Sequence, residues 1–206
     1  MNAVKPIIFN TEMVRANLDG RKRVTRRAIK WGDVRAVLNS PVRKNNPELT
    51  DRQFIEKLIP CRYEVGDILY VRENWAITSG LPGIAEDGPV YMADFSEKEL
   101  CHLRDKKFRW RPSIHMPKVL ARLWLRVTEV RAERLQDITG AEALLEGVAI
   151  NPDLKPEKQG CYYRTLFEAL WESTILPADR GLYGWSGNPW VWVIRYELCE
   201  KPGPST

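Results

Sequence analysis

The chain has 206 residues, of which 44% are hydrophobic and 29% charged; this suits one domain with elaborations and excludes disorder over most of its length. No apolar run is long enough to cross a membrane, and the start lacks the layout of a signal peptide, so we expect a cytoplasmic protein with no membrane partner. Four separated cysteines and two histidines do not match zinc-site spacings, and we expect neither a metal nor another cofactor.

The net charge of +5 is concentrated in two basic segments. In residues 15–30 the cations are opposed only by Asp19, and in residues 104–126 only by Asp105. Clustered cations release counterions when they bind phosphates, so the segments suggest a polyanion partner. Two solvated surface strips are the alternative, and charge alone does not decide between them.

The first elements are a strand at 6–9 and a helix that has Thr11 as its N-cap and is ended by Gly20. An extended stretch follows, and alternate side chains of such a stretch share a face. Two cations, Lys22 and Arg26, are therefore expected to point one way. The other face is expected to carry Arg23, Thr25 and Arg27.

Thr50 and Gln53 form a capping-box pattern at the start of a second helix, which Pro60 ends. The run 68–72 is rich in β-branched and aromatic residues and predicts a strand. Frequent glycines and prolines between residues 76 and 118 then indicate a long irregular insertion with one short strand at 90–92.

In residues 119–130 apolar residues alternate with polar ones, which predicts a strand with Trp124 on the polar side, beside Arg122. The next helix has a capping box at Thr139 and ends at Gly147. An amphipathic helix over 163–171 and a closing strand at 190–198 follow. This order favours an α+β fold with a small β-barrel over residues 1–200, and a flexible tail at 201–206.

Several motifs, in this order, resemble those of the ASCH domain family. They are Leu18-Asp19-Gly20-Arg21-Lys22, then Val65 to Glu73, the helix that closes as Glu146-Gly147, and a last strand rich in Trp and Val. Segments 109–117 and 188–192 are similar to the longer ASCH-like proteins of phages and prophages. The resemblance implies a PUA-like β-barrel with a cleft between barrel and helices, a bacterial origin, and an association with RNA or nucleosides.

The resemblance also implies a catalytic trio, because one bacterial member hydrolyses acetylated cytidine nucleosides with a Lys, a Thr and a Glu that align with Lys22, Thr25 and Glu146. A lysine with a lowered pKa can take a proton from a threonine hydroxyl, and a glutamic acid can protonate the departing amine. The insertion and Arg23 depart from that enzyme. In the alternative interpretation Lys22 contacts phosphate, Thr25 bonds within the barrel and Glu146 is solvated.

Other residues are candidates for binding nucleic acid by charge, hydrogen bonding or base stacking. A carboxylate at 73 would accept from a base amino group or pair with Arg26, and tryptophans would stack bases or pack in the core. The predicted binding residues are Arg21, Arg23, Arg26, Arg27, Glu73, Trp75, Trp110, Arg111 and His115.

Three functions remain open from the sequence. The first is binding of RNA, single-stranded DNA or a nucleotide in a basic cleft of the barrel. The second is metal-independent hydrolysis of an acylated nucleoside or of RNA by the trio, so whether the chain is an enzyme stays undecided. The third is a role in phage assembly, in which the basic loops bind protein.

Overall fold

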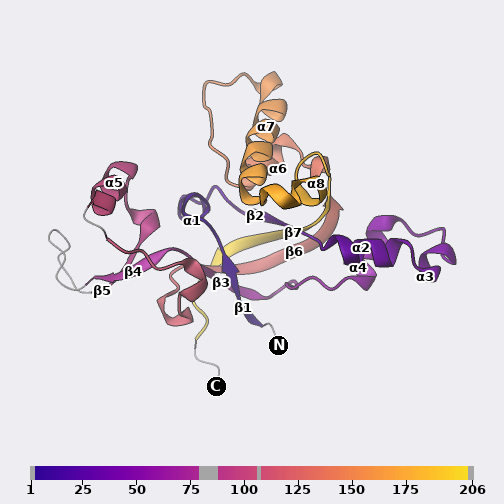
Figure 1. The fold of residues 1–206 in the computed structure, drawn as a ribbon, viewed down its shortest axis with the longest axis horizontal. Coiled ribbons are helices and arrows are strands. Elements are labelled where there is room, and N and C mark those ends of the chain that lie inside the picture. The colour runs from indigo at the N-terminus through magenta and orange to yellow at the C-terminus, as the bar shows by residue number, and fades with distance from the viewer. Residues whose placement is uncertain (1–2, 79–87, 106–107, 204–206) are drawn as a thin grey trace. The chain divides into compact units, whose positions relative to one another are not determined.

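The computed structural model describes residues 3–78, 88–105 and 108–203 (Figure 1). The fold is mixed α+β, as expected, with a five-stranded sheet of order β1-β3-β6-β7-β2 and a two-stranded sheet β4-β5. The chain forms two compact units: unit 1 comprises residues 1–20, 66–126 and 197–206, and unit 2 comprises 21–65 and 127–196. Within the described residues β1 and β2 are the two edges of the larger sheet, and no pairing between them is among the described strand pairs.

In unit 1, β1 (Val4–Ile8) pairs in parallel with β3 (Ile68–Arg72), which pairs antiparallel with the start of β6 (Trp124–Arg134). Helix α1 (Thr11–Leu18) follows β1. Its N-cap is Asn10, not Thr11 as predicted, because the Asn10 side chain accepts a hydrogen bond from the Met13 N–H at 2.8 Å. Gly20 has a φ of 71° and lies just beyond the helix, as predicted.

The segment predicted to be irregular is more ordered than its glycines and prolines suggested. Strands β4 (Trp75–Thr78) and β5 (Gly88–Tyr91) pair antiparallel. Residues 79–87, which belong to the predicted insertion, lie outside the described part of the chain. Helix α5 (Glu97–Asp105) was missed. Its signal was Ser96 with Glu99, because each contributes a side-chain oxygen that accepts from the backbone N–H of the other.

Strand β6 begins later than predicted. Residues 118–120 form a short 3-10 turn, one of three in this segment with 92–94 and 113–115, and the strand starts at Trp124. The Trp124 side chain is buried in a small core with Ile68, Trp75, Met116 and Ala121, although the alternation grouped it with polar residues. Tyr70 packs against its ring and the Lys118 ammonium lies 5.9 Å from the ring centroid, because an indole is too large and apolar to remain in water without cost.

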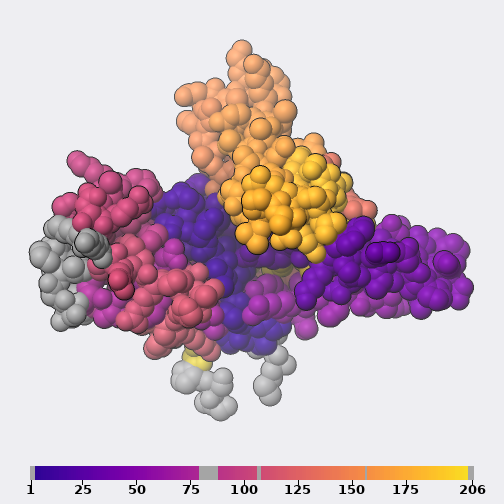
Figure 2. All heavy atoms as spheres, in the orientation of Figure 1, coloured from indigo at the N-terminus to yellow at the C-terminus, as the bar shows by residue number. Residues whose placement is uncertain are grey.

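In unit 2, β2 (Val24–Ala28) pairs antiparallel with β7 (Trp190–Cys199), with Thr25 opposite Ile194 and Arg27 opposite Trp192. Helices α2 (Trp31–Leu38) and α3 (Pro41–Lys44) were not predicted, whereas α4 (Asp51–Leu58) has the predicted capping box of Thr50 and Gln53. Figure 2 shows α2–α4 in purple and α7 in orange as separate parts of this unit.

Helix α6 (Gly140–Leu145) has the predicted capping box at Thr139, and Glu146 is its C-cap. Helix α7 (Pro156–Thr174) confirms the predicted amphipathic helix, and the short turns 135–137 and 177–179 and helix α8 (Arg180–Tyr183) complete the unit. The core here lies between β2, β7, α6 and α7, and its buried members include Val24, Leu135, Phe167, Trp171, Val191 and Val193. One face of the β2–β7 pair is therefore covered by α6 and α7 (Figure 1).

Candidate functional site

Lys22 and Glu146 meet inside unit 2. The Arg23 N–H donates to the Leu145 carbonyl at 2.8 Å, which holds the segment before β2 against the end of α6. Lys22 Nζ then donates to Glu146 Oε2, to the Glu146 carbonyl and to the Val24 carbonyl, each at 2.8 Å. Both side chains are almost fully buried. The prediction that Glu146 is a solvated acid is therefore wrong.

Arg26 extends this contact into a buried ion network. Its Nη1 donates to Glu146 Oε1 at 3.0 Å, and its Nε and Nη2 donate to Glu133 Oε1 at 2.8 and 2.6 Å. Nη2 also donates to Glu142 Oε2 at 3.2 Å, and Arg131 pairs with Glu133 and Glu142. These buried charges are stabilised because each has an opposite charge and a hydrogen bond. The described ion-pair partners of Arg26 are thus three carboxylates of unit 2.

The environment of Lys22 limits its use as a base. Burial lowers the pKa of the Lys22 ammonium below its ordinary value, while the charge and hydrogen bond of Glu146 act in the opposite direction and Arg26 and Arg27 add to the lowering. An ammonium has three N–H donors, and the three described bonds of Lys22 use them all. As an ammonium, Lys22 therefore has no lone pair with which to take a proton, and its bonds hold Glu146 in place.

Thr25 lies on the opposite face of β2 from this network. It is buried between Val24 and Arg26, and neighbouring side chains of a strand point to opposite faces. Val24 and Arg26 belong to the face under α6 and α7, since Val24 is part of that core and the Arg26 guanidinium lies 5.7 Å from the Phe167 ring. The structure therefore brings together two members of the predicted trio, and Thr25 faces away from them.

The alternation predicted for the basic stretch is confirmed. Lys22 and Arg26 share a buried face, and Arg23 and Arg27 are exposed on the other. Arg21 is half-buried, and its Nη1 donates to the Gly147 carbonyl at 3.1 Å. Of the predicted binding cations in this stretch, Arg23 and Arg27 are those that present a charged group at the surface.

Glu73 belongs to a separate ion cluster in unit 1. Arg122 donates from Nε and Nη2 to the two carboxylate oxygens of Glu73, both at 2.9 Å, and from Nη1 to Asp94 at 2.7 and 2.8 Å. The Arg122 guanidinium also stacks 4.1 Å from the Tyr91 ring centroid. Burial raises the pKa of the Glu73 carboxyl above its ordinary value, opposed by the hydrogen bonds and charge of Arg122. The described partner of Glu73 is therefore Arg122, which bonds both of its carboxylate oxygens.

The aromatic candidates of unit 1 are packed rather than presented for stacking. Trp75 is buried, and the Arg111 guanidinium lies 5.0 Å from its ring centroid. Trp110 is half-buried and makes edge-to-face contacts with Phe95 and Phe108. Both rings stabilise the segment that contains them. Arg111 and the predicted His115 are exposed.

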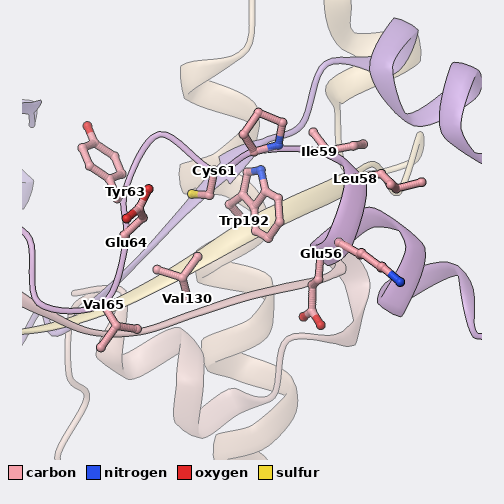
Figure 3. A pocket seen from close by; sticks show the side chains of 11 residues that line it. Glu56, Leu58, Ile59, Cys61, Tyr63, Glu64, Val65, Val130 and Trp192 are labelled. Carbon is pink, nitrogen blue, oxygen red and sulfur yellow. The ribbon is translucent and has the colours of Figure 1, made fainter.

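Sequence reasoning missed the pocket of unit 2 that Figure 3 shows, which has a volume of about 620 Å³. Among the described residues its lining contains none of the predicted site residues. The lining is formed by the end of α4, the segment after it and the sheet, and comprises Glu56, Lys57, Leu58, Ile59, Pro60, Cys61, Tyr63, Glu64, Val65, Val130 and Trp192. The sequence carried no motif for it, because the lining joins a loop to two strands distant along the chain.

The described residues contain no group of three or more His, Cys, Asp or Glu side chains placed to hold a metal ion. A helix with the length and apolar character needed to span a bilayer is likewise not found in the described part of the chain. Comparison of the chain with protein-family models, with curated proteins and with solved structures gave no match.

Proposed function

We propose that this chain is a nucleic-acid- or nucleotide-binding protein that contacts phosphates through the exposed cations of β2. The observation that carries the proposal is the division of the basic stretch: two of its cations neutralise buried carboxylates, while Arg23 and Arg27 are exposed on the other face. Lys30, just beyond the strand, is also exposed, and no acid occurs between Asp19 and Asp33. This surface strip places three exposed cations within eight residues of the chain.

The geometry of an edge strand suits an extended polyanion. Arg23 and Arg27 are four residues apart, which is about 13 Å along a strand, and they point the same way. The two guanidinium groups can therefore contact separate phosphates of one strand. RNA or single-stranded DNA fits this strip as the ligand class. We further propose that the sheet closes into the PUA-like barrel of the ASCH family, as the sequence motifs imply.

Unit 1 supports the same class of partner with its own exposed cations. Arg109, Arg111 and Lys118 lie at the surface of the segment that carries the second basic run. Lys106 and Lys107, also part of that run, lie outside the described residues. Clustered exposed cations of this kind suit contact with the phosphates of a nucleic acid.

The hydrolase alternative rests on the 2.8 Å contact between Lys22 Nζ and Glu146 Oε2. It needs Lys22 to give up its three acceptors and Thr25 to approach from the opposite face of β2. Binding needs neither change, so the geometry favours binding over hydrolysis as the function of this chain.

The proposal predicts binding that weakens steeply with salt. Each phosphate contact to a single strand contributes about 0.7 to the log–log slope, so three contacts by Arg23, Arg27 and Lys30 give a slope of about −2. Affinity for labelled single-stranded RNA, single-stranded DNA and duplex DNA, measured by fluorescence anisotropy at several salt concentrations, checks this. Affinity that does not change with salt would remove the argument for phosphate contacts.

A further inference from the structure

We propose that the pocket beside Trp192 receives the base of a nucleotide whose phosphate lies at Arg27. This inference rests on the proposed function, because it names the part of the ligand that the same face of unit 2 recognises. It concerns the pocket of Figure 3 and leaves the buried network of Lys22 and Glu146 as a structural element.

The pocket and the exposed arginine are neighbours on one face of the sheet. Arg27 lies directly opposite Trp192 in the antiparallel pair of β2 and β7. Directly opposite residues of such a pair point to the same face, with Cβ atoms about 5 Å apart. Trp192 lines the pocket and Arg27 is exposed, so the guanidinium is within reach of a ligand that enters beside Trp192.

The size and walls of the pocket suit a planar heterocycle. Its volume of about 620 Å³ falls in the range of small-molecule sites, which is about 300–1,000 Å³. Apolar groups form much of the lining, and Figure 3 shows Ile59 and Cys61 of the segment after α4 near the Trp192 indole, with Val130 on the neighbouring strand. A nucleobase gains from such walls because burial of its faces removes apolar surface from water.

The polar lining orients the ligand. Two carboxylates, Glu56 and Glu64, line the pocket together with Lys57. Glu56 is held in place, since its Oε1 accepts from the Ala132 N–H at 2.8 Å and from Arg52 Nε at 2.9 Å. Carboxylates only accept hydrogen bonds and repel phosphate, so the base faces them and the phosphate faces Arg27. Bases with an exocyclic amino group are therefore preferred to uracil.

Cys61 gives a direct readout, because this residue lines the pocket and its side chain is partly exposed. The rate of its alkylation by iodoacetamide, followed by peptide mass spectrometry, is measured with and without adenosine monophosphate. We expect adenosine monophosphate to slow alkylation of Cys61 at least fivefold and uridine monophosphate to protect less. Cys101 on α5 and Cys161 on α7 are exposed and serve as internal controls whose rates do not change.

A pocket-filling substitution, Val130→Phe, is expected to abolish the protection of Cys61 by adenosine monophosphate while salt-dependent binding of a single-stranded oligonucleotide persists. If Val130→Phe does not fold, Val65→Arg is used for the same test, because Val65 is an exposed residue of the lining. Arg27→Ala is expected to raise the nucleotide concentration needed for protection at least threefold. Oligonucleotide binding without protection of Cys61 in the unmodified protein would overturn this inference and leave the proposed function standing. Absence of oligonucleotide binding would overturn the proposed function itself.

Discussion

Lys22 carries a buried positive charge whose three donors point at three oxygen atoms of unit 2. Glu146, which receives one of these bonds, also accepts from Arg26. A charge removed from water is tolerated only while its partners are in place, and loss of one partner leaves the others uncompensated. Lys22 therefore joins the start of β2 to the end of α6.

Substitution of Lys22 by methionine is expected to lower the free energy of unfolding by about 3 kcal/mol, because it leaves part of the Glu146 charge buried without its partner. Urea unfolding followed by circular dichroism measures the change. Arg23→Met, the same type of substitution at the next and exposed position, is the matched control and is expected to change stability by about 0.5 kcal/mol or less. Equal small losses in both variants would show that the buried network contributes little.

The division of the basic stretch into a buried and an exposed face could be predicted because it follows from strand alternation alone. The partners of its buried members could not. Glu133 and Glu142 lie more than 100 residues from Arg26 along the chain, and Arg122 lies 49 residues from Glu73. Such pairs depend on which elements pack together, and local sequence patterns do not indicate the packing of distant elements.

Helix α6 positions two carboxylates of the network, and both of its ends are determined locally. At its start the Thr139 side chain accepts from the Glu142 N–H at 3.2 Å, while Glu142 also reaches Arg26 and Arg131. At its end Gly147 has a φ of 91°, which turns the chain directly after Glu146. The two helix termini thus determine where the carboxylates of Glu142 and Glu146 lie relative to β2.

Gly147→Ala tests this ending of α6. A residue with a Cβ atom in the left-handed region is less stable by roughly 1–2 kcal/mol, so we expect a loss of that size in the free energy of unfolding. Gly181→Ala is the matched control, because Gly181 lies in α8 of the same unit with no heavy atom within 4 Å of an added Cβ. Unchanged stability of the Gly147 variant would contradict a turn that requires glycine.

The helices with capping boxes or long apolar stripes, α4, α6 and α7, were predictable because their signals lie within a few residues. Helix α5 was missed although Ser96 and Glu99 marked its start, since the glycines and prolines around it dominated the interpretation. The two short helices α2 and α3 carry few buried residues and hence little periodicity. The burial of Trp124 was not predictable from the alternation, because the core that covers its ring includes Trp75 and Met116 from distant parts of the chain.

The two faces of the β2–β7 pair in unit 2 have different roles. The face under α6 and α7 contains the ion network, and its cations are neutralised by carboxylates of the chain. The opposite face carries Arg23 and Arg27, with the pocket beside Trp192. Charges on an edge strand also discourage pairing with other strands, which gives Arg23 and Arg27 a use even in the absence of a ligand. Removal of the two charges distinguishes these roles. Phosphate contacts are lost if the arginines bind nucleic acid, and none are lost if they only protect the edge.

The salt dependence of oligonucleotide affinity in two matched double variants tests the central claim most directly. Arg23→Gln/Arg27→Gln and Lys155→Gln/Lys158→Gln remove the same charge, the second pair from exposed positions at the start of α7. We expect the first variant to reduce the size of the log–log slope by about 1.4 and the second to leave it unchanged, because each lost phosphate contact accounts for about 0.7. Equal slopes in both variants and in the unmodified protein would contradict phosphate binding by this face of β2.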